Sequence, residues 1–235
     1  MARPEDNGFY TGSLLTLNTN SSDKYVKGIY DEWAEKYDKV TGEAGYVAYK
    51  TCTPIFDQLL RDKFDSKHSR LRIIDAGAGT GIVGKVLQDL GYTNIDALDI
   101  SQKMLDEAKK LNVYNNFFCA PLSEELVAEI ANDQYDALIC IGTLTVGHVK
   151  PRAFDEILRI VKPGGIIGFT LRKDVYNETV EHAVYKETTK FGYREKMDEI
   201  ENEKRWKLLR CDLIDYHTTM DELRAKCYSL MYQVL

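Results

Sequence analysis

The chain has 235 residues, of which 44% are hydrophobic and 29% are charged, and its formal net charge is −6. This composition is typical of a globular domain, and the acidic balance argues against nucleic-acid substrates, which need clustered Lys and Arg. No apolar run approaches the length of a membrane span or a signal-peptide core, so we expect a cytoplasmic protein without a membrane partner.

The N-terminal part is expected to be a flexible segment followed by helices. Residues 1–22 are rich in Asn, Thr, Ser and Gly, a composition that favours disorder. From Asp23 apolar residues recur at helical spacing, along the stripe Val26, Tyr30, Trp33, Ala34 and Tyr37. A second helix is expected over 46–64. The region 23–64 is therefore predicted to form an N-terminal helical lid.

Strands and helices then alternate as far as residue 171. The expected strands cover 71–76, 94–99, 117–119, 135–141 and 166–171. The expected helices cover 81–90, 101–111 with Ser101 as N-cap, 122–131, and a segment that starts at Pro151. The residues 162–165 (Lys-Pro-Gly-Gly) are expected to form a turn. This alternation predicts a Rossmann-like, doubly wound parallel sheet.

The alternation stops after Asp174. Residues 175–201 have a charged helical pattern and are a candidate substrate cap, while 206–216 and 227–235 read as two final strands. No strong crossover helix joins these two strands, so we expect an antiparallel last strand in a mostly parallel seven-stranded sheet. The prediction is a single α/β domain over 23–235.

The five cysteines are too widely spaced to form a metal site or a CxxC motif: Cys52, Cys119, Cys140, Cys211 and Cys227. We therefore expect buried, reduced thiols and no metal.

The first strand ends in an acid and runs into a glycine-rich turn, Asp75-Ala-Gly-Ala-Gly-Thr-Gly81. Glycines permit positive φ and remove Cβ atoms that would block a ligand. Gly79-x-Gly81-x-x-Gly84 also matches a dinucleotide fingerprint, but Asp75 would repel a pyrophosphate. Asp99 ends the second strand, where a carboxylate can bind a ribose diol. These residues point to an adenosine-type ligand, either NAD or S-adenosylmethionine.

Four motifs in the correct order resemble class I S-adenosylmethionine-dependent methyltransferases. They are Asp75–Gly81, Ala97–Ser101, Tyr135–Ile141 and Lys162–Gly165. The segments Tyr30–Asp38 and Gly142–Val149 and the Trp206 region extend the resemblance, over roughly residues 25–235, to the methyltransferase-like family of the Williams–Beuren syndrome chromosome region. This second resemblance implies a cofactor but no firm substrate.

The resemblance implies that S-adenosylmethionine is the cofactor and S-adenosylhomocysteine the product. Gly77, Ala78 and Gly79 should line the methionine moiety, with Asp75 near its ammonium group and Asp99 on the ribose. The adenine contacts implied are Ala120, Pro121 and Leu122, together with Ile100 and Met104, which could equally pack in the core. The third-strand end lacks the acid that the family often uses on adenine, which leaves that recognition to backbone groups or to another part of the site.

The methyl side of the site is expected after the fourth strand, at Gly142 and Thr143. His148 is the one histidine near this edge and is a candidate base, although a lone histidine is more often structural. The aromatic stripe of Tyr30, Trp33 and Tyr37 could cover the cofactor and contact its sulfonium, or could be simple core packing.

The leading hypothesis is a methyltransferase that acts on a small molecule by in-line displacement. The alternatives are a protein methyltransferase, an NAD-dependent oxidoreductase built on Gly79, Gly81 and Gly84, and a non-catalytic binding or scaffold protein of the same fold. The displacement needs no signature catalytic residue, because the leaving group is a neutral thioether.

Overall fold

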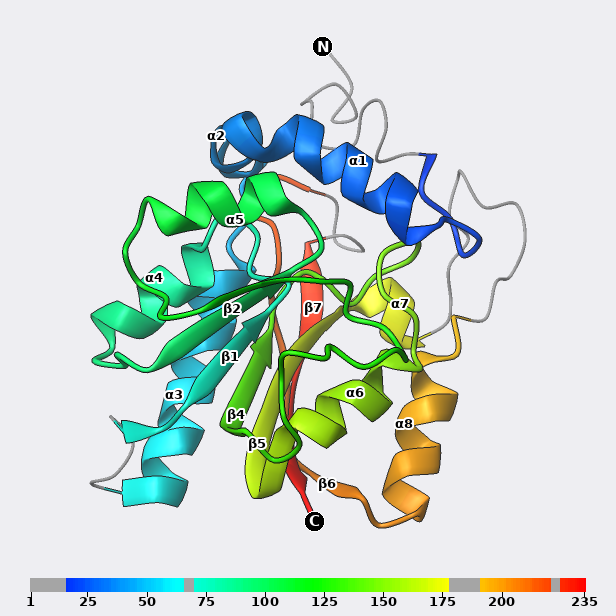
Figure 1. Cartoon of the computed structure of the whole chain (residues 1–235). Helices are drawn as coiled ribbons and strands as arrows, with labels where there is room; N and C mark the ends of the chain where they lie inside the picture. The colour runs from blue at the N-terminus through cyan, green and yellow to red at the C-terminus, as the bar shows by residue number, and fades with distance from the viewer. Residues whose placement is uncertain (1–15, 66–69, 178–190, 221–224) are drawn as a thin grey trace.

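The computed structural model describes residues 16–65, 70–177, 191–220 and 225–235. Its centre is a seven-stranded sheet in the order β3-β2-β1-β4-β5-β7-β6. Helices cover both faces of this sheet (Figure 1). The predicted Rossmann-like, doubly wound architecture is therefore confirmed.

The strands are β1 (Ile73–Ala76), β2 (Ile95–Asp99), β3 (Phe117–Cys119), β4 (Tyr135–Cys140), β5 (Val161–Arg172), β6 (Trp206–Asp215) and β7 (Lys226–Val234). The pairs from β3 to β5 are parallel. β7 is antiparallel to both β5 and β6, so the predicted antiparallel last strand is inserted between two strands that run the other way.

The helices are α1 (Asp23–Trp33), the 3-10 turn η3 (Ala34–Lys36), α2 (Tyr37–Glu43), α3 (Ala48–Phe64), α4 (Ile82–Asp89), α5 (Gln102–Lys109), α6 (Ala153–Ile160), α7 (Lys173–Asn177) and α8 (Tyr193–Asn202). Within the described ranges, no helix is long and apolar enough to cross a membrane. We call α1, η3 and α2 together the lid, because they lie across one end of the sheet (Figure 1).

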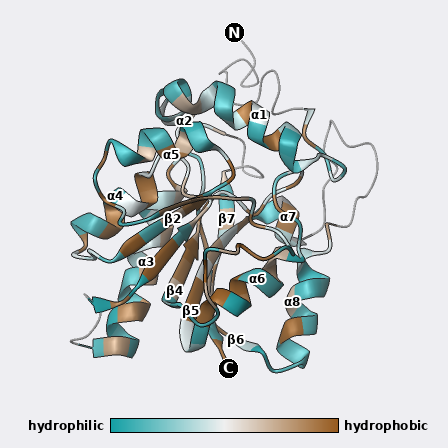
Figure 2. Ribbon diagram, viewed as in Figure 1, coloured by the Kyte–Doolittle hydropathy of each residue, from teal (hydrophilic) through white to brown (hydrophobic). Residues whose placement is uncertain are grey.

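The core consists of two apolar layers, one on each face of the sheet. Ile73 belongs to the layer that contains Phe56 of α3 and Leu87 of α4. Its neighbour Ile74 belongs to the layer that contains Ile157 of α6. Successive side chains of a strand point to opposite faces, so a strand buried on both faces is mainly apolar, with Asp75 as the exception in β1. Figure 2 shows these strands as mainly hydrophobic.

The predicted helix over 122–131 is wrong. These residues form bends and turns, in which Leu122, Val127 and Ile130 are buried against the sheet while Leu126 is 69% exposed. The backbone N–H of Val127 donates to the buried carboxylate of Glu156, at 2.9 Å. A tertiary acceptor thus takes a donor that a helix would have used, and apolar spacing alone cannot show this.

Two other boundaries differ from the sequence prediction. The predicted turn at 162–165 lies within β5, as an irregularity between the pairs Tyr135↔Val161 and Ala137↔Ile166. Gly164 has φ 83° there, which glycine adopts readily. Helix α6 begins at Ala153, and Pro151 belongs to the preceding turn.

Several expectations apply only in part to the described residues. Residues 1–15 and 178–190, and with them most of the predicted flexible segment and part of the candidate cap, lie outside the described residues. Leu17 is buried with Val26 and Ile29, so this residue, which was predicted to be flexible, is packed against α1. Cys119 and Cys211 are exposed, which corrects the expectation of buried thiols, whereas Cys52, Cys140 and Cys227 are buried.

Gly84 is required where α4 contacts Tyr114. A Cβ atom at Gly84 would lie 2.4 Å from the Tyr114 hydroxyl oxygen, whereas at Gly28 of α1 it would meet nothing within 4 Å. The Gly84→Ala variant should therefore be destabilised by about 1–3 kcal/mol through overpacking. Gly28→Ala should be stabilised by up to about 1 kcal/mol through helix propensity.

Urea unfolding of both variants checks this expectation. A Gly84→Ala protein as stable as the parent would show that Tyr114 moves aside without cost.

Candidate cofactor site

A pocket lies where the carboxyl ends of β1, β2, β3 and β4 meet the lid. Its lining comes from the lid (Asp23, Val26, Tyr30, Tyr37), from the β1 and β2 ends (Gly77, Gly79, Leu98, Asp99, Ile100, Met104), from the residues after β3 (Ala120, Pro121, Leu122) and from the β4 end and the loop after it (Ile141, Gly142, Thr143, His148, Val149). The carboxyl edge of an open parallel sheet is the expected binding crevice of such folds.

The glycine turn after β1 is tied to the end of β2 by its own backbone. The N–H groups of Gly77 and Ala78 both donate to the carbonyl of Leu98, at 2.7 and 3.0 Å. Gly77 has φ 77°, and a Cβ there would lie 2.1 Å from the hydroxyl oxygen of Thr143. Glycine is therefore needed at this position both for its backbone conformation and for its small volume.

Asp99 extends the same connection with its side chain. Its Oδ2 accepts from the N–H of Gly79 at 2.8 Å, and its Oδ1 accepts from the N–H of Ser101 at 2.8 Å. Burial raises the pKa of Asp99 to about 6. The Ser101 hydroxyl accepts from the N–H of Met104 at 3.1 Å, which confirms the predicted N-cap of α5.

Asp75 lies beneath the glycine turn rather than in the pocket wall. Its side chain is fully buried, and its Oδ2 accepts from the hydroxyl of Tyr114 at 2.6 Å. Its Oδ1 has no hydrogen-bond partner among the residues that the structure describes. Burial raises the pKa of Asp75 to about 7, so the carboxyl group is close to half protonated at neutral pH.

Three side-chain hydrogen bonds join the lid to three different strand ends. Asp38 accepts from the hydroxyl of Thr80, at 2.5 Å, after β1. Asp31 accepts from the hydroxyl of Ser101, at 2.6 Å, after β2. The hydroxyl of Tyr30 lies 2.7 Å from His148 Nε2 in the loop after β4. The lid is therefore held closed over the pocket by polar contacts as well as by apolar ones.

Asp31 and Asp38 were not predicted from the sequence, because single acids on a helix usually face solvent. A signal was nevertheless present. Tyr30-Asp31 recurs as Tyr37-Asp38, which places each acid next to an aromatic residue of the inward stripe.

The aromatic stripe divides between two roles. Tyr30 and Tyr37 line the pocket, with ring centroids 6.2 Å apart. Trp33 is buried instead in a small cluster with Ala34 and Met104, where it fixes the lid to α5. The two interpretations of the stripe, cover and core packing, thus apply to different residues.

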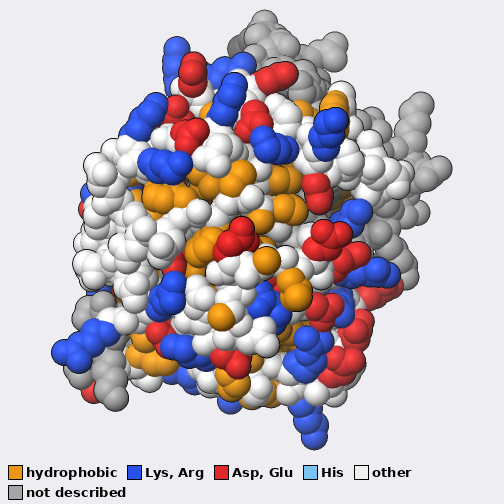
Figure 3. All heavy atoms as spheres, viewed as in Figure 1, with side chains coloured by type: hydrophobic (Ala, Val, Ile, Leu, Met, Phe, Trp, Pro, Cys, Tyr) orange, Lys and Arg blue, Asp and Glu red, His pale blue; other side chains and the backbone are white. Residues whose placement is uncertain are grey.

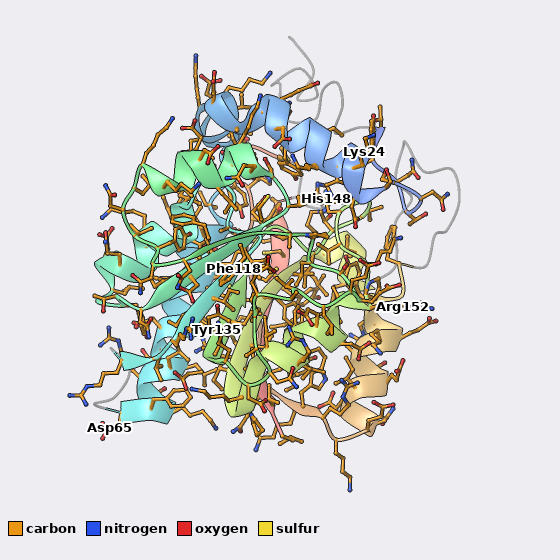
Figure 4. The ribbon with its side chains drawn as sticks, viewed as in Figure 1. Lys24, Asp65, Phe118, Tyr135, His148 and Arg152 are labelled. Carbon is orange, nitrogen blue, oxygen red and sulfur yellow. The ribbon has the colours of Figure 1, made fainter. Side chains whose placement is uncertain are left out.

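His148 has a defined tautomer in the loop after β4. Its Nδ1 lies 2.9 Å from the carbonyl oxygen of Val146. Because a carbonyl can only accept, Nδ1 carries the proton. Nε2 is then the acceptor for the Tyr30 hydroxyl, at 2.7 Å. Burial, with a contribution from the charge of Arg172, lowers the pKa of His148 to about 4, so the imidazole is neutral at physiological pH. Figure 4 places His148 below α1.

The structure brings most of the residues singled out from the sequence into one pocket. Asp75, Ala78 and Trp33 are buried outside its lining, and cofactor contact by any member of the set stays a prediction. The pocket also has lining residues that the sequence reasoning did not name, which are Asp23, Val26, Leu98, Ile141 and Val149. Leu98, Ile141 and Val149 lie within the motif segments, but an apolar side chain there is expected to pack in the core; Asp23 and Val26 belong to the lid helix.

The buried Asp75 should make the free protein less stable as the pH rises. A carboxyl group whose pKa is raised by folding contributes stability below its unfolded pKa of about 3.9, and this contribution is lost as the pH rises through about 7. From pH 5 to pH 8, the unfolding free energy of Asp75→Asn should therefore increase relative to that of the parent by about 2–3 kcal/mol.

Chemical denaturation at a series of pH values measures this difference. Asp106→Asn is the control, since Asp106 is exposed and its ion pair with Lys109 lowers its pKa. A constant difference between Asp75→Asn and the parent across this range would contradict a raised Asp75 pKa.

Sequence comparison relates the chain to methyltransferases. A profile described as a methyltransferase domain matches residues 74–169. The human methyltransferase-like protein 27 is 30% identical over 155 residues, which are 66% of this chain and 61% of that protein. A malonyl-acyl-carrier-protein O-methyltransferase of Pectobacterium atrosepticum is 33% identical over 109 residues, 46% of this chain and 41% of that enzyme. The matched region thus spans less than two thirds of either relative.

Solved structures agree in fold over nearly the whole chain. The cyclase SpnF superimposes with a TM-score of 0.63 at 16% identity, covering 93% of this chain and 98% of that chain. Magnesium protoporphyrin IX methyltransferase of Synechocystis, solved with bound S-adenosylhomocysteine, gives a TM-score of 0.60 at 14% identity, covering 91% and 100%. Residues 74–169 thus match a methyltransferase domain in sequence, and the chain as a whole has the fold of solved methyltransferases.

Proposed function

We propose that this chain binds S-adenosylmethionine in the pocket beneath the lid and transfers its methyl group to a small-molecule acceptor. The observation that carries the proposal is the position of Asp99. Its carboxylate lines the pocket and is fixed next to the glycine turn by the N–H of Gly79. A fixed carboxylate at the end of the second strand suits a ribose diol.

The lining residues suggest how the cofactor would lie. Ile100, Met104 and the segment 120–122 offer an apolar slot for adenine beside Asp99. Gly77, Gly79, Gly142 and Thr143 would surround the methionine part, with Ala78 contributing only backbone. Asp75 is buried beneath the glycine turn with an unpartnered Oδ1, so its carboxylate would act on the ammonium group through its charge or through an intervening water.

Methyl transfer requires the protein mainly to position the two reactants and to exclude water. The methyl acceptor must approach in line with the carbon–sulfur bond at about 3–3.5 Å. The rings of Tyr30 and Tyr37 line the same pocket, where an aromatic face could stabilise a sulfonium cation by about 0.5–2 kcal/mol. The closed lid would exclude water from the reacting carbon.

The glycine turn argues against the NAD-dependent alternative. The N–H groups of Gly77 and Ala78 donate to Leu98, that of Gly79 donates to Asp99, and that of Gly81 donates to Ala78. A diphosphate site needs free N–H groups at such a turn. Gly84, the third glycine of the fingerprint, donates to the Tyr114 hydroxyl at 3.2 Å.

The class of acceptor is supported by the relatives and by the surface. Several relatives, the malonyl-acyl-carrier-protein and ubiquinone-biosynthesis O-methyltransferases, transfer a methyl group to oxygen. Figure 3 shows Lys and Arg interspersed with Asp and Glu on the face that it displays, whereas a nucleic-acid acceptor needs clustered Lys and Arg. A protein acceptor is the second candidate, and the SpnF likeness shows that a cyclase also has this fold.

Isothermal titration calorimetry tests the proposed cofactor. S-adenosylmethionine and S-adenosylhomocysteine should both bind, and NADH fluorescence should not change on mixing. Failure of both sulfur ligands to bind at millimolar concentration would overturn the proposal. A scaffold role predicts binding with no methyl transfer to any metabolite fraction.

Replacing Asp99 should weaken binding of S-adenosylhomocysteine. Asp99→Ala removes the charged acceptor for the ribose diol, and the expected loss is roughly 2–3 kcal/mol in binding free energy. Calorimetry measures the dissociation constant, with Asp106→Ala on the exposed side of α5 as the control. An unchanged constant would show that the ribose is held elsewhere.

Loosening the lid should speed release of the ligand. The lid lies over the pocket and is bound to the loops after β1 and β2, so we expect it to move when a nucleoside enters or leaves. Asp38→Ala removes the Thr80 hydrogen bond, worth about 1 kcal/mol, and should raise the dissociation rate severalfold.

Deletion of residues 1–40 should reduce affinity further.

Stopped-flow tryptophan fluorescence, to which Trp33 of the lid contributes beside the buried Trp206, follows the lid, with Glu43→Ala at the exposed end of α2 as the control. Equal dissociation rates in Asp38→Ala and the parent would show that this hydrogen bond does not hold the lid closed.

A further inference from the structure

The loop after β4 separates two cavities. The second cavity, of about 530 Å³, lies between this loop and the beginning of α8, and is lined by residues that include Thr145, Arg152, Gly192 and Tyr193. His148 and Val149 line both this cavity and the cofactor pocket. A ligand in the second cavity and a cofactor in the first would therefore meet at His148.

The wall between the cavities is held in place from both sides. The hydroxyl of Tyr193 donates to the carbonyl of Val149. On the pocket side, the Tyr30 ring contacts the imidazole edge-on, with centroids 5.5 Å apart. His148 Nδ1 is fixed to Val146, so its basic nitrogen, Nε2, has one orientation, toward Tyr30.

On the assumption that the proposed function is correct, we propose that Tyr30 and His148 form a proton relay for the methyl acceptor. The reacting group of the acceptor reaches Tyr30 in the cofactor pocket past His148 and Val149, while the rest of the acceptor lies in the second cavity. The acceptor is then a neutral hydroxyl or amine, because only a nucleophile that still carries its proton needs a base. A carboxylate or thiolate acceptor is already deprotonated and would make no use of the relay.

The step balances in atoms and in charge. The acceptor lone pair forms a bond to the methyl carbon, and the carbon–sulfur bond breaks with its electron pair remaining on sulfur. The acceptor proton passes to the Tyr30 oxygen while the Tyr30 proton passes to His148 Nε2. One positive charge is on sulfur before the step and on the imidazole after it. The buried site therefore never holds more than its initial charge, and the imidazolium later loses its proton to water.

His148 is neutral before the step, and the burial that keeps it neutral also makes it a weaker base than a free imidazole. Among the described residues, the Tyr30 hydroxyl is hydrogen-bonded to His148, and the charge of Arg172 from β5 lowers the pKa of His148. The acids Asp23 and Asp99 line the same pocket. The imidazole enters the reaction as a free base, and its proton-accepting nitrogen is already in a hydrogen bond.

The first experiment locates the reacting position without any acceptor. The full chain is crystallised with sinefungin, which has an amine where S-adenosylmethionine has its methyl group, and the His148 tautomer is determined by ¹⁵N NMR. The amine should lie within hydrogen-bond reach of the Tyr30 oxygen, directly or through one water, and Nδ1 should carry the proton. An amine directed away from Tyr30, or a proton on Nε2, would overturn the relay.

The second experiment measures the relay with model acceptors. Phenol, aniline and benzoate are supplied at millimolar concentration with S-adenosylmethionine labelled in its methyl group. Transfer to phenol or aniline should fall about 100-fold in His148→Gln, and Tyr30→Phe should also lose activity. The KM for the cofactor should change little, which a merely structural defect would not produce. Tyr25→Phe on the same helix and His217→Gln, a second buried histidine, are the matched controls.

The outcomes separate this inference from the proposed function. A chain that does not bind S-adenosylhomocysteine contradicts the proposed function itself. A chain that binds it but prefers benzoate, or transfers to phenol equally well in His148→Gln, contradicts only the relay. If none of the three probes is methylated, the position of the sinefungin amine and the tautomer of His148 decide whether the relay is correct.

Discussion

The candidate site depends on the hydrogen bonds that fix the glycine turn to the end of β2. The carbonyl of Leu98 and the carboxylate of Asp99 together accept from three consecutive N–H groups, those of residues 77–79. The turn is thereby built before any ligand arrives, and its donors are already satisfied. This single constraint favours a ligand recognised by carboxylates over one that needs backbone N–H groups.

The lid adds the second half of the site. Its aromatic residues divide between the pocket and the contact with α5, and its acids bind the loops after β1 and β2. Because each of these hydrogen bonds is worth only about 1 kcal/mol net, the lid can be both closed and able to open. The same helix brings Tyr30 to His148, so the element that would exclude water also contributes a polar group at the methyl side.

Sequence patterns predicted the structure correctly where buried side chains follow the regular repeat of a strand or a helix. The alternation of strands and helices led to the correct, mostly parallel sheet, and the missing crossover helix led to its antiparallel last strand. They failed at residues 122–131, where the apolar spacing is helical but the Glu156 carboxylate binds the Val127 N–H. They also failed at Cys119 and Cys211, because a strand at an edge of the sheet leaves side chains exposed.

The sequence by itself determined the fold, the glycine turn and the acid that ends β2, because these depend on local backbone conformation and on short-range order along the chain. Only the tertiary structure decided the direction of each side chain. It placed Asp75 beneath the turn with Tyr114, divided the aromatic stripe, and joined His148 to Tyr30 across 118 positions of sequence. Such contacts depend on packing between distant segments, which no local pattern encodes.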